Sequence, residues 1–122
     1  MSDAFEKPMD WIGSAKKDLL AFPAEVIQSI GYGLGFVQLG RTPDNAKMLH
    51  GLGSGVWELV ENAADGTYRA VYVVRFEKVI YVLHCFQKKS KKGTSTPKPD
   101  MDLIRQRLGT AQSDYAENYE KK

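Results

Sequence analysis

The stretch YRAVYVVRFEKVIYVLHCFQKKSKKGTSTP, residues 68–97, decides the fold of this chain. It begins with an apolar run, turns at residues 76–78, and runs apolar again before it breaks into a lysine-rich segment. Val, Ile, Tyr and Phe dominate both apolar runs, and these side chains suit a pleated, half-buried surface. The pattern predicts two antiparallel strands, residues 68–75 and 78–87, joined by a tight turn.

Positive charge is concentrated in the same region. Residues 69–98 contain eight lysines and arginines and a single glutamate, a local net charge of +7, whereas the whole chain carries only +2. The remainder of the chain is therefore net acidic. A local cationic patch favours an anionic partner, while the modest total argues against a protein that is coated with positive charge.

The length and composition fit a single domain, residues 1–122, that needs no disulfide bond or bound metal for its stability. A chain of 122 residues matches the usual size of one domain. The only cysteine, Cys85, cannot form an internal disulfide, and its place in an apolar strand predicts a buried, unreactive thiol. Two histidines and one cysteine show none of the spacings that zinc needs, so we expect no metal site and no cofactor.

Membrane and export signals are not visible in the sequence. No apolar run approaches the roughly 20 residues that a membrane-spanning helix needs. The N-terminal sequence MSDAFEKPMDW lacks the apolar core of a secretory signal. We therefore expect no membrane association and a cytoplasmic location.

The N-terminal third of the chain predicts one short strand followed by two helices. Residues 1–7 are polar and expected to be frayed, and residues 8–12 begin with a proline and alternate like an edge strand. Ser14 fits the N-cap of a helix over residues 15–21, and a proline fits the start of a second helix over residues 23–39. The second helix has apolar residues at helical spacing, namely Val26, Ile27, Ile30, Leu34 and Val37.

Three glycines interrupt the second helix, Gly31, Gly33 and Gly35, and each costs about 0.5–1 kcal/mol relative to alanine. Gly31 and Gly35, four residues apart, would let another backbone segment approach closely. Alternatively, the GYGLG run would be a loop that cradles a phosphate. Close packing is favoured, because no strand precedes the run and no lysine, serine or threonine stands where a nucleotide loop needs one.

Turn residues and periodicity predict the remaining elements. Residues 41–55 predict a loop that contains His50, which is interpreted as a solvated surface histidine. Residues 56–60 predict a strand, residues 62–66 a hairpin turn, and residues 88–99 a loop without apolar periodicity.

The C-terminal part predicts a helix followed by a polar tail at residues 117–122. From Asp100 onwards, apolar residues recur in steps of three and four, which predicts one apolar stripe on a helix. The stripe consists of Met101, Ile104, Leu108, Ala111 and Tyr115.

The order strand, helix, helix, three strands, helix predicts an α+β fold. A small antiparallel sheet of about four strands needs cover on a face, and the N-terminal helical hairpin provides it. The second face is either covered by the C-terminal helix or left open. An open face beside a basic loop would be a surface that can receive an extended anionic polymer.

His84 is a first candidate for chemistry. Alternation puts His84, Phe86 and Lys88 on one side of their strand. Nearby lysines disfavour the imidazolium, and a neutral imidazole suits a general base. The spacing alone nevertheless favours a histidine that is held by a hydrogen bond within the sheet.

Arg69 is a second candidate, near the start of a central strand. A buried arginine without a partner would cost several kcal/mol in desolvation. Its partner is therefore a carboxylate, for which Glu58 or Glu61 of the adjoining strand is available, or a phosphate. The residues alone leave these two alternatives equal.

The densest positive run consists of four lysines, Lys88, Lys89, Lys91 and Lys92. A solvated loop is the usual explanation for such a run. It directly follows a strand end, however, and lysines that neutralise the phosphate backbone are the main source of nucleic-acid affinity. Phe86 or Tyr72 could stack a base, which contributes about 1–3 kcal/mol.

Several segments, taken together, resemble a known family. GVWEL, GTYRAVY, YVLHCFQKKSKKG and TPK occur in this order, after PMDWIGSAKKDLLAFP near the N-terminus. This combination resembles the HigB-like branch of the RelE/ParE superfamily of type II toxins, and it covers most of the chain. The resemblance implies a small α+β fold in which two N-terminal helices pack on an antiparallel sheet.

The resemblance also implies a function and partners. Most such toxins are messenger-RNA interferases that cut within the ribosomal A site. An adjacent antitoxin, often a helix-turn-helix DNA-binding protein, neutralises them. The superfamily also contains members that poison DNA gyrase and cleave nothing. A gyrase inhibitor of the ParE type and an inactive relative that only binds its antitoxin are therefore the alternatives.

The reaction implied by the resemblance is attack of a ribose 2′-hydroxyl on its own phosphorus, which leaves a cyclic phosphate. The family's basic residues fall here on Arg69, Lys88 and Lys89, which would stabilise charge, and this shifts the expected partner of Arg69 towards a phosphate. His84 or one of the lysines would be the base or the acid. The expected RNA contacts are Tyr72, Phe86, Lys91 and Lys92.

Overall fold

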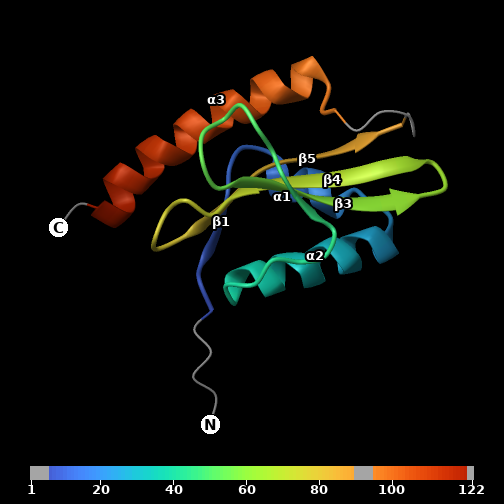
Figure 1. The fold of residues 1–122 in the computed structure, drawn as a ribbon, viewed down its shortest axis with the longest axis horizontal. Coiled ribbons are helices and arrows are strands. Elements are labelled where there is room, and N and C mark those ends of the chain that lie inside the picture. The colour runs from blue at the N-terminus through green and yellow to red at the C-terminus, as the bar shows by residue number, and fades with distance from the viewer. Residues whose placement is uncertain (1–5, 90–94, 121–122) are drawn as a thin grey trace, which may run out of the picture.

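The fold is a mixed five-stranded sheet with α2 on one side and α3 on the other (Figure 1). The structure is a computed structural model of the chain, and it describes residues 6–89 and 95–120. In chain order the elements are β1 (Met9–Trp11), α1 (Ala15–Leu20), α2 (Ala24–Gln38), β2 (Ala46–Met48), β3 (Val56–Ala63), β4 (Gly66–Val73), β5 (Ile80–Lys88), α3 (Lys98–Tyr115) and a π-helical turn, Ala116–Glu120.

The strand order β1-β5-β4-β3-β2 corrects the expected sheet in two respects. There are five strands among the described residues rather than about four, and β1 runs parallel to β5, so the sheet is mixed and not purely antiparallel. The α+β class, the edge position of β1 and the antiparallel order of β3, β4 and β5 are confirmed.

Both corrections have a physical reason. β2 is three residues long and lies inside the segment that its turn residues predict as a loop, so it shows no periodicity of its own. It becomes a strand because it pairs with β3, with Ala46 opposite Leu59. The direction of β1 is set by the path through α1 and α2, since alternation reports which side a residue faces and not which way a neighbouring strand runs.

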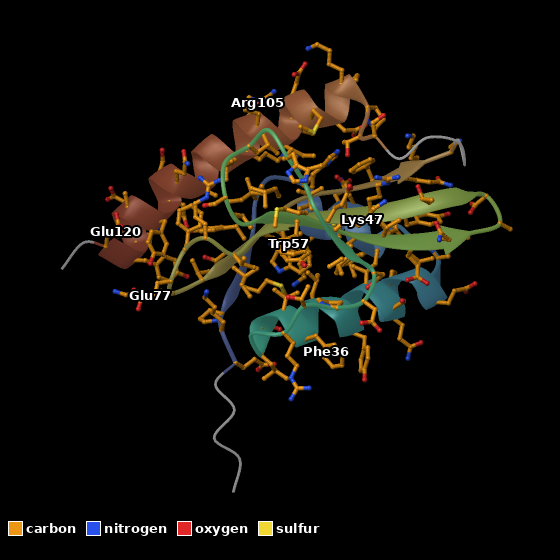
Figure 2. All side chains as sticks on the ribbon, viewed as in Figure 1. Phe36, Lys47, Trp57, Glu77, Arg105 and Glu120 are labelled. Carbon is orange, nitrogen blue, oxygen red and sulfur yellow. The ribbon has the colours of Figure 1, made fainter. Side chains whose placement is uncertain are left out.

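Alternation along β4 divides the core into two layers. Tyr68, Ala70 and Tyr72 point to the side of α2, whereas Val71 and Val73 point to the side of α3. The opposite sides of the helices face solvent, and Arg105 of α3 is an exposed residue on such a side (Figure 2). Each layer therefore joins one face of the sheet to one set of helices.

A bulge in β5 sets which residues join each layer. Val71 pairs with His84 and Tyr72 pairs with Val82, so Leu83 is an extra residue in β5. Leu83 and His84 consequently both face α3. The carbonyl oxygen of Leu83 accepts a hydrogen bond from Arg107 Nη1 of α3 at 2.9 Å, which satisfies a backbone group that a bulge can leave without a ladder partner.

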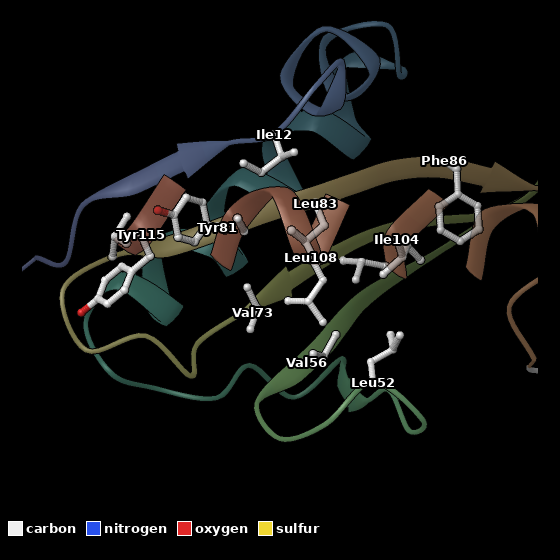
Figure 3. Close-up of a cluster of buried hydrophobic side chains, with 13 residues drawn as sticks. Ile12, Leu52, Val56, Val73, Tyr81, Leu83, Phe86, Ile104, Leu108 and Tyr115 are labelled. Atoms are coloured by element: carbon white, nitrogen blue, oxygen red, sulfur yellow. The ribbon is translucent and has the colours of Figure 1, made fainter. Parts of the chain in front are cut away.

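α3 covers the second face of the sheet, so the alternative of an open face is excluded. Its apolar stripe packs against residues of β4 and β5, as Figure 3 shows for Ile104, Leu108 and Tyr115. The expected polar tail is helical as far as Glu120, and the Tyr119 hydroxyl donates to Asp10 Oδ2 of β1 at 2.9 Å. Neither α3 nor another helix in the described part of the chain is long and apolar enough to cross a membrane.

The glycines of α2 pack differently from the expectation. The GYGLG run is helical, which excludes a phosphate-cradling loop there. The expected close packing is wrong for Gly31 and Gly35, because no described atom lies within 4 Å of the position that a Cβ would take at either residue. A close contact occurs instead at Gly33, where a Cβ would lie 3.1 Å from a methyl carbon of the Leu59 side chain.

The β3–β4 hairpin requires glycine at residue 66. Gly66 has a φ of 128°, and a Cβ there would lie 2.5 Å from the carbonyl oxygen of Lys88. We expect Gly66→Ala to lower the free energy of unfolding by about 1–3 kcal/mol, the cost of a strained backbone residue. Urea denaturation followed by circular dichroism measures the difference.

Gly109→Ala is the matched control for this substitution. Gly109 lies in α3, is exposed, and has no described atom within 4 Å of its Cβ position. Alanine should therefore raise the free energy of unfolding by about 0.5–1 kcal/mol there. A Gly66→Ala protein as stable as the wild type would contradict the hairpin geometry.

The buried thiol expected from the sequence is confirmed. Cys85 is 2% exposed, and burial raises the pKa of its thiol to about 12. Because the thiolate is the reactive form, we expect native Cys85 to react with Ellman's reagent at pH 8 at least about 100-fold more slowly than the urea-unfolded chain. Comparable rates in the two states would show that the α2 layer opens readily.

Candidate functional site

The α3 side of the sheet brings together four residues that the sequence singled out. Arg69 pairs with Phe86 across β4 and β5, and Thr67 pairs with Lys88. Because of the bulge, His84 lies on this same side. The structure thus places Arg69, His84, Phe86 and Lys88 on one face, while Lys89 follows exposed at the end of β5. Lys91 and Lys92 lie outside the described residues.

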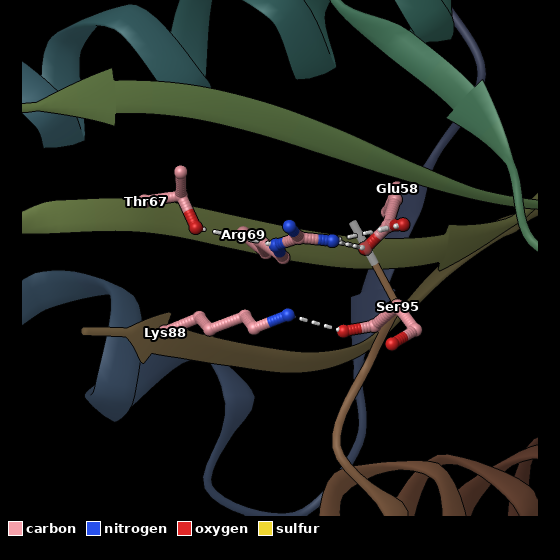
Figure 4. Close-up of polar contacts among 5 residues, drawn as sticks. All are labelled: Glu58, Thr67, Arg69, Lys88 and Ser95. Atoms are coloured by element: carbon pink, nitrogen blue, oxygen red, sulfur yellow. Dashed lines mark hydrogen bonds and ion pairs between the residues drawn. The ribbon is translucent and has the colours of Figure 1, made fainter. Parts of the chain in front are cut away.

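Arg69 is held in a buried ion pair. Its Nη1 donates to both carboxylate oxygens of Glu58, at 3.2 and 3.3 Å, and its Nε donates to Thr67 Oγ1 at 3.4 Å (Figure 4). Arg69 is 2% exposed and Glu58 3%. Of the two alternatives for its partner, the structure contains the carboxylate. That carboxylate belongs to Glu58, while Glu61 on the other side of β3 accepts a hydrogen bond from Ser29.

A cleft of about 360 Å³ lies beside this ion pair. Its lining residues come from β2 and the loop after it, from β3, from the segment before α3 and from the first turn of α3, and they are Lys47, Met48, Leu49, His50, Glu58, Ser95, Thr96 and Met101. Glu58 is therefore in contact both with Arg69 and with the cleft. Lys47 sits directly opposite Glu58 in the β2–β3 register, which places a second cation next to the carboxylate.

Lys47 and His50 are the site residues that sequence reasoning missed. Lys47 was not considered because its strand was expected to be a loop, and its pairing with Glu58 becomes visible only once β2 is known. His50 is exposed, in agreement with the sequence-based interpretation, but it lines the cleft. The only sign of such a pair in the sequence is a lysine and a histidine three residues apart, beside a turn-rich segment.

Lys88 connects the end of β5 to the same cleft. Its Nζ donates to the carbonyl oxygen of Ser95 at 2.6 Å, and Ser95 lines the cleft (Figure 4). The lysine therefore spans from the sheet to the segment that leads into α3. Lys47 thus lines the cleft, and Lys88 of another strand contacts one of its lining residues.

His84 links β5 to the first turn of α3. Its Nε2 lies 2.7 Å from Asp100 Oδ1, and its ring stacks on Phe86 with centroids 4.8 Å apart. His84 is 7% exposed, and its Nδ1 is buried with no hydrogen-bond partner among the described residues. The histidine is hydrogen-bonded, as the spacing favours, but its partner lies in α3 and not within the sheet as expected. Asp100 is well placed at a helix N-terminus, where the helix dipole favours negative charge.

Tyr72 does not join this site. It points to the opposite side of β4, belongs to the α2 layer and is 2% exposed. Burial raises the pKa of its hydroxyl to about 12. The structure therefore separates Tyr72 from Phe86, although both were expected to contact the same ligand. In residues 6–89 and 95–120 there is also no group of three or more His, Cys, Asp or Glu that could hold a metal ion.

Comparisons with known proteins agree with the fold. Residues 17–109 match the family model described as phage derived protein Gp49-like, and no curated protein matches the chain. A mutant of the Escherichia coli toxin RelE in the free state is similar in structure, with a TM-score of 0.61 and 20% sequence identity over 84% of this chain and 98% of that one. The isolated Escherichia coli RelE toxin is also similar in structure, with a TM-score of 0.52 and 19% sequence identity over 82% of this chain and 97% of that one.

These comparisons confirm the fold that the resemblance implies. At such identities the structural likeness concerns the fold, and the HigB-like branch stays a prediction. The matched stretch begins within α1, ends within α3 and includes the whole of β2 to β5. It exceeds half of the chain. The protein has the RelE-like fold and belongs to the phage-derived Gp49-like family.

Proposed function

We propose that this protein is the toxin of a toxin–antitoxin pair and that it cleaves messenger RNA on the ribosome. The observation that carries the proposal is the cleft on the α3 side of the sheet. Lys47 and His50 line it, and Lys88 reaches it through Ser95. The RelE-like fold supports the same function, because it is shared with a toxin.

The charge around the cleft suits a phosphodiester. Glu58 is the one carboxylate among the lining residues, and its charge is balanced by the buried Arg69. Lys47, Lys88 and Lys89 then leave an excess of positive charge for the RNA backbone. Lysines that neutralise phosphates supply affinity that falls steeply as salt rises. We also propose Lys91 and Lys92 as RNA contacts, on the basis of the sequence alone.

The proposed reaction needs a base, an acid and positive charge. The 2′-hydroxyl gives its proton to the base and attacks the adjacent phosphorus, and the bond from phosphorus to the 5′-oxygen breaks. That oxygen takes a proton from the acid, which leaves a 2′,3′-cyclic phosphate and a 5′-hydroxyl. Lys47, Lys88 and Lys89 would stabilise the charge on the non-bridging oxygens. Arg69 would add positive charge from its buried position.

His50 is the better placed histidine for proton transfer. Histidine is the side chain most suited to this role near neutral pH. His84, the candidate from the sequence, is almost fully buried and held by Asp100, so it could act only if the start of α3 moved. His50 lines the cleft without such a movement. We therefore assign proton transfer to His50 and a positioning role to His84 and Phe86.

The proposed partners follow from this function. The RNA would be engaged on the ribosome, and a cognate antitoxin, in our proposal a helix-turn-helix protein, would neutralise the toxin. Covering the cleft or displacing the segment that contains Ser95 would be enough to prevent access of RNA to Lys47 and His50.

Inducible expression in a bacterium, followed by mapping of messenger-RNA ends, tests the proposed cleavage. We expect new ends in phase with codons in translated messages. Lys88→Ala combined with Lys89→Ala should reduce cleavage by about 100-fold or more, because it removes charge that the transition state needs. His50→Gln should reduce it similarly and differ from the wild type by no more than about 0.5 kcal/mol in stability. The double variant also loses the hydrogen bond from Lys88 to Ser95 and should be less stable by about 0.5–1.5 kcal/mol, which leaves it folded.

The matched control for the double substitution is Lys16→Ala combined with Lys17→Ala. These lysines are exposed on α1, so the loss of charge is the same but its place is different. We expect that control to cleave as the wild type does. Intact messenger RNA together with a DNA-damage response would refute the proposal and favour a gyrase inhibitor.

A second experiment separates the structural role of Arg69 from its proposed role in catalysis. Glu58→Gln alone removes the buried carboxylate charge that faces Arg69 and should lower the free energy of unfolding by about 3 kcal/mol. Glu58→Leu combined with Arg69→Met replaces the pair by apolar groups, which is commonly neutral or stabilising. We expect the double variant to regain stability in urea denaturation but to lose RNA cleavage. Full cleavage by the stable double variant would remove Arg69 from the site.

A further inference from the structure

A second pocket lies on the α2 side of the sheet, away from the cleft. Its volume is about 240 Å³, and it sits where the C-terminal end of α2 meets the strands. Its lining residues are Lys7, Val37, Gly40, Arg41, Thr42, Trp57, Tyr72, Val74 and Ile80. None of these residues takes part in the proposed cleavage, so the pocket requires a separate explanation.

Tyr72 is the unusual member of the lining. Its side chain is almost fully buried and its hydroxyl makes no hydrogen bond to the described residues, but the hydroxyl oxygen is not shut off from solvent, because it faces the pocket. The hydroxyl is therefore open to water in the pocket, and a ligand with an acceptor group can take the place of that water. A tyrosine hydroxyl is protonated at neutral pH and can donate, and burial raises the pKa of Tyr72 further, to about 12.

The polar rim of the pocket is cationic. Lys7 and Arg41 line it, and the lining set contains no acidic residue. Both residues are held by the end of α2. The Lys7 amide donates to Gln38 O at 2.9 Å, Gln38 Nε2 donates to Lys7 O at 2.8 Å, and the Arg41 amide donates to Phe36 O at 3.0 Å. Their side chains have no ion pair with the described carboxylates.

The remaining walls are apolar and include a flat aromatic surface. Trp57 and Tyr72 are direct cross-strand partners on β3 and β4, and Val37, Val74 and Ile80 line the same space. Pockets for drug-sized ligands usually measure about 300–1,000 Å³. At 240 Å³ this pocket is too small for a nucleotide and large enough for a ligand of one or two rings.

We propose that this pocket binds a small aromatic carboxylate. The ring of the ligand packs against Trp57 and the aliphatic side chains, and the carboxylate accepts a hydrogen bond from the Tyr72 hydroxyl. Arg41 and Lys7 supply the opposite charge at the rim. The site lies on the opposite face of the sheet from the cleft and does not depend on the proposed RNA cleavage.

Titration of the full-length, ¹⁵N-labelled protein with indole-3-acetate tests the proposal. We expect saturable binding that shifts the indole N–H resonance of Trp57, while that of Trp11, which does not line the pocket, stays in place. Indole-3-acetamide, which lacks the charge, should bind at least about tenfold more weakly, since hydrogen bonds to charged groups are the stronger ones. Equal binding of the two probes would overturn the proposal.

Tyr72→Phe removes only the hydroxyl and keeps the ring. We expect it to weaken indole-3-acetate binding about tenfold, and Arg41→Gln to weaken it severalfold and reduce its salt dependence. Lys16→Gln, on exposed α1, is the matched control and should bind as the wild type does. The hydroxyl makes no hydrogen bond to the described residues, so the melting temperature of Tyr72→Phe without ligand should stay close to that of the wild type, which excludes misfolding as a cause.

The melting temperature gives an independent readout. Indole-3-acetate should raise it for the wild type in proportion to occupancy and raise it less for Tyr72→Phe. Unchanged affinity in Tyr72→Phe, absence of saturable binding, or shifts confined to residues near Lys47 and His50 would each refute a carboxylate site at this place.

Discussion

The bulge at Leu83 and His84 is the constraint on which the site depends. With regular alternation from Tyr81 onwards, Cys85 would face α3, and His84 and Phe86 would turn to α2. The extra residue reverses this arrangement in the second half of β5 and brings His84 and Phe86 to the side of Arg69. A bulge disturbs the ladder locally, and here Arg107 donates to the Leu83 carbonyl from α3. α3 therefore covers this face of the sheet and also stabilises the bulge that brings His84 and Phe86 to it.

The α3 face has an apolar part under the helix and a polar part beside it, and the Arg69–Glu58 pair lies at their boundary. A buried ion pair rarely stabilises a protein more than well-packed apolar side chains would. Its presence in this core is thus poorly explained by stability alone. A buried arginine whose carboxylate partner also lines a cleft provides fixed charge next to an accessible space. That arrangement accords with the proposed handling of a phosphodiester.

The sequence predicts much of the fold and only part of the site. Periodicity places α1, α2 and α3 within one or two residues of their bounds, because long apolar patterns carry strong signals. β2 has three residues and no pattern, so Lys47 could not be placed beside Glu58. Alternation orders side chains within one strand, whereas the partner of Arg69 depends on register between strands. His50 illustrates the same limit, since its exposure was predicted but its neighbours were not.

The parallel pairing of β1 with β5 has a consequence for the timing of folding during synthesis. β1 leaves the ribosome before its partner strand, which follows some seventy residues later, from Met9 to Ile80. The hydrogen bond between Asp10 and Tyr119 then joins the two extremes of the chain. Contacts of such long sequence separation form late. The edge strand of the sheet can be locked only after β5 has left the ribosome, and the contact of β1 with the turn after α3 forms only after residue 119 has followed.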